Sequence, residues 1–416
     1  MTRSLDAETD REGEAATPAA ADFDLVVADA SWSWTERLFA PLSALGQRLL
    51  LIKACDWRTA HNQKRPARDW LCPQRQVEDG LWERTFVLPP GWMKTYPRLG
   101  MLPIAWAVRD WRKGLDAPRP LVLAISYPHY LHLRDLVQPD ALIYYNMDDY
   151  GFYWAGRREI VRTLEQQSVR EADLSAFCAR IRADELRVEV PEADDRIIHL
   201  PHGAPASAIS PGPRHRPGPA PADLAALARP YLGFVGSLED RIDWGLVEHL
   251  AREFPEGSIV LIGREPVAAP QLDWYRDYQR AVARPNVHLL GWKSQDEIGA
   301  YNAAFDACLI PYRTDHPFNR VACPTKVMDY MATSRPIVST DLPECRLYSH
   351  LFDVTATCEA FATAVRRIVD RGSDDGRAAQ RWEAARASTW EHRSETLLRQ
   401  FRGRIESRTA RLSTAE

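Results

Sequence analysis

The chain has 416 residues, of which 45% are hydrophobic, and its 53 basic and 57 acidic residues give a net charge of -4. This length suffices for two or three domains that each bury their own core, which excludes a small scaffold held together by disulfides. The balance of charge argues against a nucleic-acid partner, because proteins that bind phosphate backbones need a strongly basic face.

The cysteines and the apolar runs indicate the compartment. Seven cysteines are scattered along the chain, and none forms the Cys-x-x-Cys pair that is common in zinc sites. We therefore expect reduced thiols in a cytoplasmic protein, and no metal site. Residues 1–22 are acidic, small and polar, which predicts a disordered tail without a signal peptide. No apolar run reaches the roughly 18 residues that a membrane-spanning helix needs, so any membrane contact is expected to be peripheral.

The first half of the chain, residues 23–210, is expected to form one domain. Short β-branched runs alternate with longer amphipathic stretches, the pattern of a parallel sheet covered by helices, so the fold class is α/β. Strands are predicted at 25–27, 49–52, 121–124, 141–145 and 196–200. The segment 101–115 combines Trp106 and Trp111 with basic residues. We favour a helix that packs on the core over one that lies in a membrane surface.

The second half is expected to repeat this architecture. Proline-rich residues 211–230 predict a linker, because proline removes backbone donors and fixes φ. A second α/β domain is predicted over 231–375. Its expected strands lie at 231–235, 258–262, 287–289, 307–310 and 336–339. In 376–416, apolar residues at helical spacing predict one or two closing helices.

Two loops after predicted strands are candidates for binding phosphate. Gly236 and Ser237 lie between the strand at 231–235 and a helix that begins near Asp243. Small residues let backbone amides approach an anion, and a helix N-terminus favours negative charge. Arg264 follows the next strand. An ordinary tight turn and an ordinary surface arginine are the alternatives. Because ligands bind beyond the carboxyl ends of parallel strands, we expect both loops to line one crevice.

The segment that follows the strand at 307–310 carries the strongest signal. Pro324 suits the first turn of a predicted helix. Thr325 and Lys326 then place a hydroxyl, free amides and an ammonium where a diphosphate would bind. Asp329 lies on nearly the same helical face, where its carboxylate can accept hydrogen bonds from ribose hydroxyls. A capped surface helix with a Lys/Asp pair is the alternative interpretation.

With these motifs the sequence resembles the nucleotide-sugar-dependent glycosyltransferases of the GT-B fold, in particular bacterial enzymes that build polysaccharides and glycolipids. The matching segments are the glycine-rich loop, the NVxxLG strand, the PxKxxEYxA helix, the acidic strand end and the LPNG motif, here at 233–237, 286–291, 324–332, 144–150 and 200–203. The resemblance implies two facing Rossmann-like domains with an interdomain cleft. It also implies a helix near Trp390 that crosses back to the first domain.

The resemblance implies a hexosyltransferase that moves a sugar from a nucleoside diphosphate sugar to a saccharide or lipid-linked acceptor. The C-terminal domain would bind the donor, and the N-terminal domain the acceptor. No cofactor beyond the donor substrate and no metal are implied. The expected location is the cytoplasm, at the inner face of the plasma membrane if the acceptor is lipid-linked.

Glycosyl transfer requires stabilisation of the departing diphosphate, for which Lys326 is the first candidate. Arg241 is the second, and an ion pair of Arg241 with Glu239 or Asp243 is the alternative.

An inverting enzyme also needs a general base on the acceptor side. Asp148 and Asp149 follow the strand at 141–145, and His129 follows the strand at 121–124. All three are expected at the rim of the cleft. A surface Asp-Asp turn and a histidine that caps a loop are the alternatives.

One departure from the family pattern keeps other functions open. Many retaining members carry a Glu-x7-Glu pair, whereas here the second acid is Asp329 and the first position is Val321. Neighbours such as Asp315, His316 or Asn319 must then recognise the sugar. A sugar-nucleotide epimerase of the same fold and a non-catalytic scaffold protein therefore remain as alternatives.

Overall fold

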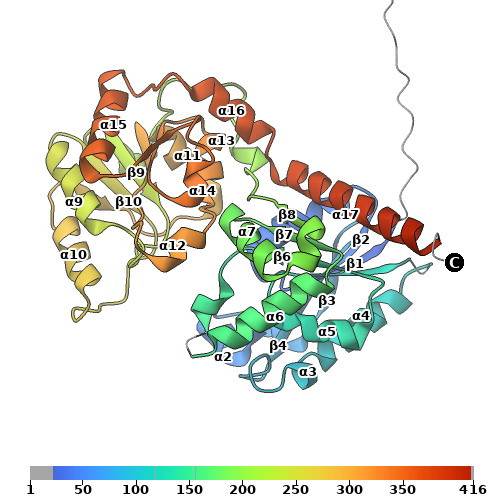
Figure 1. The fold of residues 1–416 in the computed structure, drawn as a ribbon. Coiled ribbons are helices and arrows are strands. Elements are labelled where there is room, and N and C mark those ends of the chain that lie inside the picture. The colour runs from blue at the N-terminus through green and yellow to red at the C-terminus, as the bar shows by residue number, and fades with distance from the viewer. Residues whose placement is uncertain (1–21, 118, 155, 414–416) are drawn as a thin grey trace, which may run out of the picture.

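The computed structural model describes residues 22–413 apart from 118 and 155, so nearly all of the expected tail at 1–22 lies outside the described residues. The chain forms two lobes, one from its first half and one from its second (Figure 1). Each lobe contains one sheet with helices on both faces. The predicted α/β class is confirmed.

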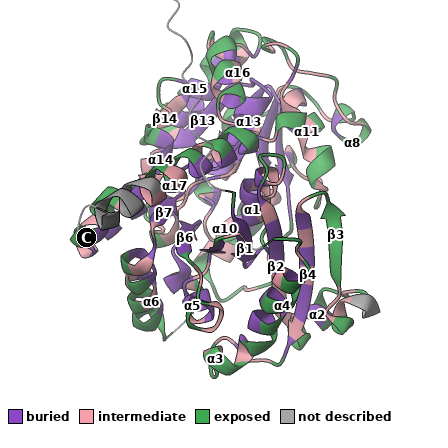
Figure 2. Ribbon diagram, turned by 90° about the vertical axis from the view of Figure 1, so that its right-hand side faces the viewer, coloured by how far each residue is buried: buried purple, intermediate pink, exposed green. Residues whose placement is uncertain are grey.

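The sheet of the N-terminal lobe has the strand order β3-β4-β2-β1-β5-β6-β7-β8, with every neighbouring pair parallel except β3 and β4. Its strands are β1 (Asp24–Ala28), β2 (Arg48–Asp56), β3 (Gln74–Glu78), β4 (Leu81–Leu88), β5 (Leu121–Ile125), β6 (Ala141–Asn146), β7 (Leu174–Phe177) and β8 (Ile197–His199). The five predicted strands are confirmed as β1, β2, β5, β6 and β8. The other three strands, β3, β4 and β7, were missed; of these, the edge strand β3 is exposed and carries almost no apolar residues (Figure 2).

Alternating side chains of this sheet build two separate cores. Val26 and Ala28 face helices α4 (Leu102–Lys113), α5 (Leu131–Val137) and α7 (Arg180–Glu189). Leu25 and Val27 face α1 (Ser33–Phe39) and α17 (Trp390–Ser413) on the other side. The remaining helices of this lobe are α2 (Trp57–Asn62), α3 (Pro97–Gly100) and α6 (Arg158–Glu171).

Helix α4 packs on the core, as we expected. Ile104, Val108 and Trp111 belong to the core that covers one face of the sheet. Trp106 points outward and is 60% exposed, with the Arg84 guanidinium 5.4 Å from its ring centroid. Among the described helices, none is both long enough and apolar enough to cross a membrane.

The sheet of the C-terminal lobe is parallel throughout, in the order β11-β10-β9-β12-β13-β14. Its strands are β9 (Tyr231–Val235), β10 (Ser258–Ile262), β11 (Val287–Leu289), β12 (Ala307–Ile310), β13 (Ile337–Thr340) and β14 (Asp353–Thr355). The five predicted strands are confirmed, and only the short, half-buried β14 was missed. The helices of this lobe are α9 (Trp244–Glu253), α10 (Asp273–Val282), α11 (Gln295–Ala304), α12 (Pro317–Val321), α13 (Lys326–Ala332), α14 (Pro343–Arg346), α15 (Cys358–Asp370) and α16 (Ala378–Arg386).

Along the chain, the proline-rich segment lies between the last strand of the first sheet, β8, which ends at His199, and the first strand of the second sheet, β9, which begins at Tyr231. Its one α-helix is α8 (Ala222–Ala225), which is short, as the prolines require. We propose this segment as the linker between two domains.

The C-terminal helix α17 returns to the N-terminal lobe and lies along it (Figure 1). Leu397, Leu398 and Phe401 pack into the core formed with β1 and α1. The Ser394 hydroxyl donates a hydrogen bond to the Leu38 carbonyl at 2.5 Å. The expected crossing-back helix is therefore confirmed.

The start of α17 explains why residue 203, at the end of the LPHG segment 200–203, is a glycine. A Cβ on Gly203 would lie 2.6 Å from the backbone nitrogen of Trp390. Backbone hydrogen bonds join Ala204 to Ser388 and to Trp390 on either side of this approach. Only a residue without a side chain allows the two segments to come this close.

We predict that Leu397→Ala lowers the free energy of unfolding by about 2–5 kcal/mol, because it leaves a cavity where α17 meets the first sheet. Leu397 is 0% exposed. Urea denaturation followed by circular dichroism measures the change. Gln400→Ala, an exposed position on the same helix, is the control and should change stability little. Equal effects of the two variants would contradict this account of α17.

Candidate active site

A cavity of about 510 Å³ lies between the two lobes, and we call it the interlobe cavity. Four of the residues proposed from the sequence as catalytic or donor-binding line it, namely Asp148 from the N-terminal lobe and Arg241, Thr325 and Lys326 from the C-terminal lobe. More than 80 residues of sequence separate Asp148 from Arg241, and Arg241 from Thr325. They meet because the carboxyl ends of both sheets open onto the same space. These four residues therefore share one cavity, whereas Gly236, Ser237 and Arg264, from the two loops expected to line one crevice, are not among its lining residues.

Lys326 is the first residue of α13 and is only 8% exposed. Its Nζ donates a hydrogen bond to the Tyr312 hydroxyl and lies 4.5 Å and 5.2 Å from the ring centroids of Tyr312 and Phe234. Among the described residues, no carboxylate forms an ion pair with it. The aromatic rings hold the ammonium in place without neutralising it, so its charge is available to an anionic ligand. The helix starts at Lys326, two residues later than the position of Pro324 suggested.

The glycine-rich turn lies directly beside this ammonium. A Cβ on Gly236, whose φ is 153°, would lie 3.4 Å from Nζ of Lys326. A Cβ on Gly263 would lie 1.9 Å from the Gly236 carbonyl oxygen, so the ends of β9 and β10 approach each other closely. Ser237 and Arg264 are exposed and do not line the interlobe cavity. The structure therefore places Gly236 beside Lys326 and the other two candidates at the nearby surface.

Arg241 is held by aromatic rings rather than by carboxylates. Its guanidinium carbon lies 4.6 Å from the ring centroid of Phe318 and 5.7 Å from that of Tyr312. Neither Glu239 nor Asp243 forms an ion pair with it in the described structure, so the simple pairing considered from the sequence does not occur. Arg241 thus presents a second charge to the interlobe cavity.

Asp329 does not line the interlobe cavity. Burial raises the pKa of Asp329 to about 6, while the charges of Arg37 and Lys326 oppose this rise. Arg37 belongs to α1, so a cation of the opposite lobe favours the ionised form of the Asp329 carboxylate. Its expected contact with ribose hydroxyls stays a prediction.

Of the three neighbours expected to replace the missing acid at Val321, one remains on the cavity. Asp315 is exposed and pairs with Arg313 at 2.8 Å. Asn319 is buried and donates hydrogen bonds to the carbonyls of Arg241 and Arg313, both at 2.9 Å. His316 lines the interlobe cavity, caps α12, and has Nε2 3.5 Å from Asp240.

A second cavity, also of about 510 Å³, is formed by the N-terminal lobe, and we call it the aromatic cavity. Seven of its lining residues are aromatic, namely Trp32, Trp34, Trp92, Tyr127, Tyr150, Tyr153 and Trp154. Trp32, Trp34, Met147, Asp148 and Tyr153 line the interlobe cavity as well. The two cavities are therefore neighbours that share a wall. Sequence reasoning missed the aromatic cavity because its rings come from four separate loops.

Asp148 is part of this shared wall. Its carboxylate accepts a hydrogen bond from the Tyr153 hydroxyl. Burial raises the pKa of Asp148 to about 6, and the hydrogen bond from Tyr153 and the charge of Arg241 limit the rise. A carboxylate with such a pKa is mostly ionised at neutral pH and is still a better proton acceptor than an ordinary aspartate.

The other two candidates for the base do not reach either cavity. Asp149 turns away, because its carboxylate caps the 3₁₀ helix η4 (Tyr150–Tyr153) and pairs with Arg158 at 3.1 Å. His129 is buried and stacks on Trp154, with ring centroids 4.0 Å apart. Burial lowers the pKa of His129 to about 4. These two expectations are corrected, since Asp149 has a structural role and His129 lies outside the cavity lining.

Asp29, which the sequence reasoning missed, lines the aromatic cavity directly after β1. Its φ of 68° is unusual for a residue other than glycine, and such strain is often retained at functional sites. The Ser126 hydroxyl donates a hydrogen bond to it at 3.3 Å, while burial raises its pKa to about 7. Its place at the end of a central strand was the one signal that could have identified it.

Residues 229–371 match the family model described as glycosyl transferases group 1. TuaH of Bacillus subtilis (strain 168), whose name assigns it to teichuronic acid biosynthesis as a glycosyltransferase, is 20% identical over 288 residues. That match covers 64% of this chain and 68% of TuaH. The chain is a glycosyltransferase, and its second half matches group 1.

Solved structures share the fold of this glycosyltransferase. Anabaena Alr3699/HepE in complex with UDP matches with a TM-score of 0.63 and 13% identity, over 91% of this chain and 98% of that chain. A UDP-forming α,α-trehalose-phosphate synthase from Burkholderia xenovorans matches with a TM-score of 0.62 and 11% identity, over 92% and 99%. The fold is GT-B, as the resemblance implied.

The burial of Asp29 predicts how the stability of this glycosyltransferase depends on pH. Because the pKa of Asp29 is raised from 3.8 to about 7 in the folded state, the folded protein binds more protons between these values, and this carboxyl lowers stability as pH rises. Asp29→Asn cannot ionise. We expect its melting temperature, relative to wild type, to be higher at about pH 8 than at about pH 5. Differential scanning calorimetry at both pH values tests this, and a constant difference would contradict it.

Proposed function

We propose that this glycosyltransferase moves a hexose from a nucleoside diphosphate sugar in the interlobe cavity to a saccharide in the aromatic cavity. The observation that carries the proposal is the position of Asp148, which lines both cavities. A base at the shared wall can accept a proton from an acceptor hydroxyl while that hydroxyl faces the donor sugar.

The donor side is supported by two cations without carboxylate partners among the described residues. Lys326 and Arg241 both rest on aromatic rings and line the interlobe cavity. Thr325 adds a hydroxyl next to Lys326. As the bond to the sugar breaks, negative charge grows on the diphosphate, and fixed cations stabilise that charge. Because HepE was solved with UDP and with UDP and glucose, uridine diphosphate is the first nucleotide to test.

The acceptor side is supported by the lining of the aromatic cavity. Flat rings such as Trp32 and Trp92 offer apolar surface to the faces of sugar rings. Asp29 and Asp56 supply carboxylates that can accept hydrogen bonds from sugar hydroxyls. A cavity of this kind has no use in an epimerase, which acts on the nucleotide sugar alone. It therefore favours a transferase with a saccharide acceptor.

The cellular setting is part of the same proposal. All seven cysteines are free thiols, which fits the expected cytoplasmic location. The name of TuaH refers to the synthesis of a polysaccharide, so we propose an acceptor that is a growing saccharide. If that saccharide is lipid-linked, the exposed Trp106 on α4 is the first candidate for contact with the membrane surface.

We predict that Lys326→Ala weakens the binding of UDP by roughly 10- to 100-fold, because a charge-assisted contact to the diphosphate is lost. Isothermal titration calorimetry measures the affinity, with GDP, TDP and ADP as competing nucleotides. Lys293→Ala is the matched control, since Lys293 pairs with Asp223 and does not line the interlobe cavity. Unchanged affinity in Lys326→Ala would rule out this donor site.

We predict that Asp148→Asn lowers kcat by about 100-fold or more while UDP affinity is kept, as expected for the loss of a general base. In wild type, the rate should fall as pH drops through about 6, where Asp148 becomes protonated. Tyr153→Phe removes a hydrogen bond that lowers this pKa, so the fall should begin at a higher pH. Product formation is followed with UDP-sugars and oligosaccharide acceptors.

The adjacent variant Asp149→Asn is the control for Asp148→Asn, because the Asp149 carboxylate caps a helix and Asp149 lines neither cavity. Asp149→Asn should lower the free energy of unfolding and change kcat little. A normal kcat in Asp148→Asn would exclude Asp148 as the base. A free epimerised nucleotide sugar in the wild-type reaction would instead identify the epimerase.

A further inference from the structure

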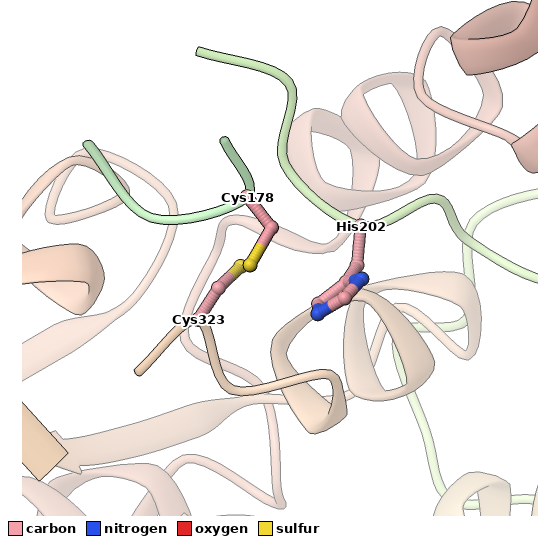
Figure 3. A group of neighbouring side chains, drawn as sticks. All are labelled: Cys178, His202 and Cys323. Atoms are coloured by element: carbon pink, nitrogen blue, oxygen red, sulfur yellow. The ribbon is translucent and has the colours of Figure 1, made fainter. Parts of the chain in front are cut away.

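Two cysteines and a histidine meet where the lobes join (Figure 3). Cys178 follows β7, His202 follows β8, and Cys323 directly precedes Pro324 in the C-terminal lobe. Their ligand atoms, two sulfurs and a ring nitrogen, all lie within 4.8 Å of one another. The two cysteine side chains point toward each other, and the imidazole lies beside them.

One ring nitrogen of the buried His202 side chain lacks a hydrogen-bond partner among the described residues. His202 is only 3% exposed, and this nitrogen is its buried Nδ1. Its ring is packed against Trp34 and Trp390, with centroids 5.7 Å from each. A buried polar atom without a partner is costly unless a ligand satisfies it.

The cysteines complete a donor set of a defined kind. Cys178 is buried and donates a weak hydrogen bond to the Met147 carbonyl at 3.0 Å, whereas Cys323 is half-buried. Thiolate sulfur together with neutral imidazole is the combination that zinc prefers over magnesium or calcium. Three protein ligands leave one of four tetrahedral positions for water or another ligand.

We propose that Cys178, His202 and Cys323 bind a Zn²⁺ ion that joins the two lobes. On binding, two S–H bonds are replaced by two S–Zn bonds and two protons are released to solvent, with no change in oxidation state. No step of glycosyl transfer requires this ion, so the site is independent of the proposed function.

The site would fix the donor residues relative to the acceptor lobe. Cys323 is separated from Lys326 by two residues, and both Cys323 and His202 line the interlobe cavity. Without the metal, nearby cross-lobe contacts include Glu344, which accepts hydrogen bonds from the Arg180 amide at 2.9 Å and from His199 at 3.0 Å. A bound ion adds a much stronger link at the same junction. The three proposed ligands lie far apart in the chain, so no spacing motif in the sequence marks this cluster.

The test measures metal directly in the full-length protein, purified with a non-thiol reductant. We expect one zinc per chain by inductively coupled plasma mass spectrometry, and thiolate-to-cobalt charge-transfer absorption when Co²⁺ replaces Zn²⁺. Adding Zn²⁺ to the metal-free protein should raise its melting temperature. The variants Cys178→Ser, Cys323→Ser and His202→Gln should each weaken zinc binding by more than roughly 10- to 100-fold, the loss typical for an outer-shell partner.

Cys55→Ser is the matched control, since Cys55 is also partly buried but lies outside the cluster. It should bind zinc as wild type does. Circular dichroism shows whether each variant is folded, and Cys323→Ser, at the less buried cysteine, keeps the test valid if Cys178→Ser does not fold. Wild type without zinc or the cobalt band, or equal zinc in folded cluster variants, would overturn the proposal. So would a Cys178–Cys323 disulfide that persists in the metal-free, reductant-treated protein.

Discussion

The arrangement of the site depends on the packing of α17 against the first sheet. This helix belongs to the end of the chain, yet Leu397 and Phe401 complete the core of the N-terminal lobe. Its first residue, Trp390, lies against Gly203, just before the proline-rich segment. The chain therefore crosses between the lobes twice at nearly the same place. Because both crossings are held there, the carboxyl ends of the two sheets face one cavity.

Within that cavity, aromatic rings hold charged groups where carboxylates would have neutralised them. Lys326 lies over Tyr312 and Phe234, and Arg241 lies over Phe318. Ring faces stabilise a cation while leaving its charge unbalanced, which suits a site for an anion that arrives and leaves. The shared wall carries a carboxyl group, that of Asp148, whose pKa burial raises to about 6. Glycosyl transfer requires positive charge near the departing diphosphate and a proton acceptor near the acceptor hydroxyl. Cations on one side of the wall and a carboxyl group with a raised pKa on the other are groups of these two kinds.

The sequence was informative wherever function is encoded locally. Continuous apolar runs marked ten strands, and the spacing around Lys326 marked residues that line the interlobe cavity, because backbone and side chains within one turn determine both. It was less informative where function depends on folding. Asp149 follows the same strand as Asp148 but caps η4 and pairs with Arg158, and adjacent residues on an irregular loop give no sign of which one lines the cavity. The rings of the aromatic cavity and the partners of Cys178 come from segments that only the fold brings together.

The missing acid at Val321 changes how the donor sugar must be recognised. Val321 is buried at the end of α12, so this position offers no polar group to the cavity. Asn319 is committed to backbone carbonyls, which leaves His316 with its neighbour Asp240 on the cavity wall. A histidine and a carboxylate 3.5 Å apart can together donate and accept hydrogen bonds, as a sugar hydroxyl requires. With Val321 in place of the acid, His316 and Asp240 are the polar pair from two loops that this part of the cavity wall offers, while Lys326 and Arg241 line the same cavity.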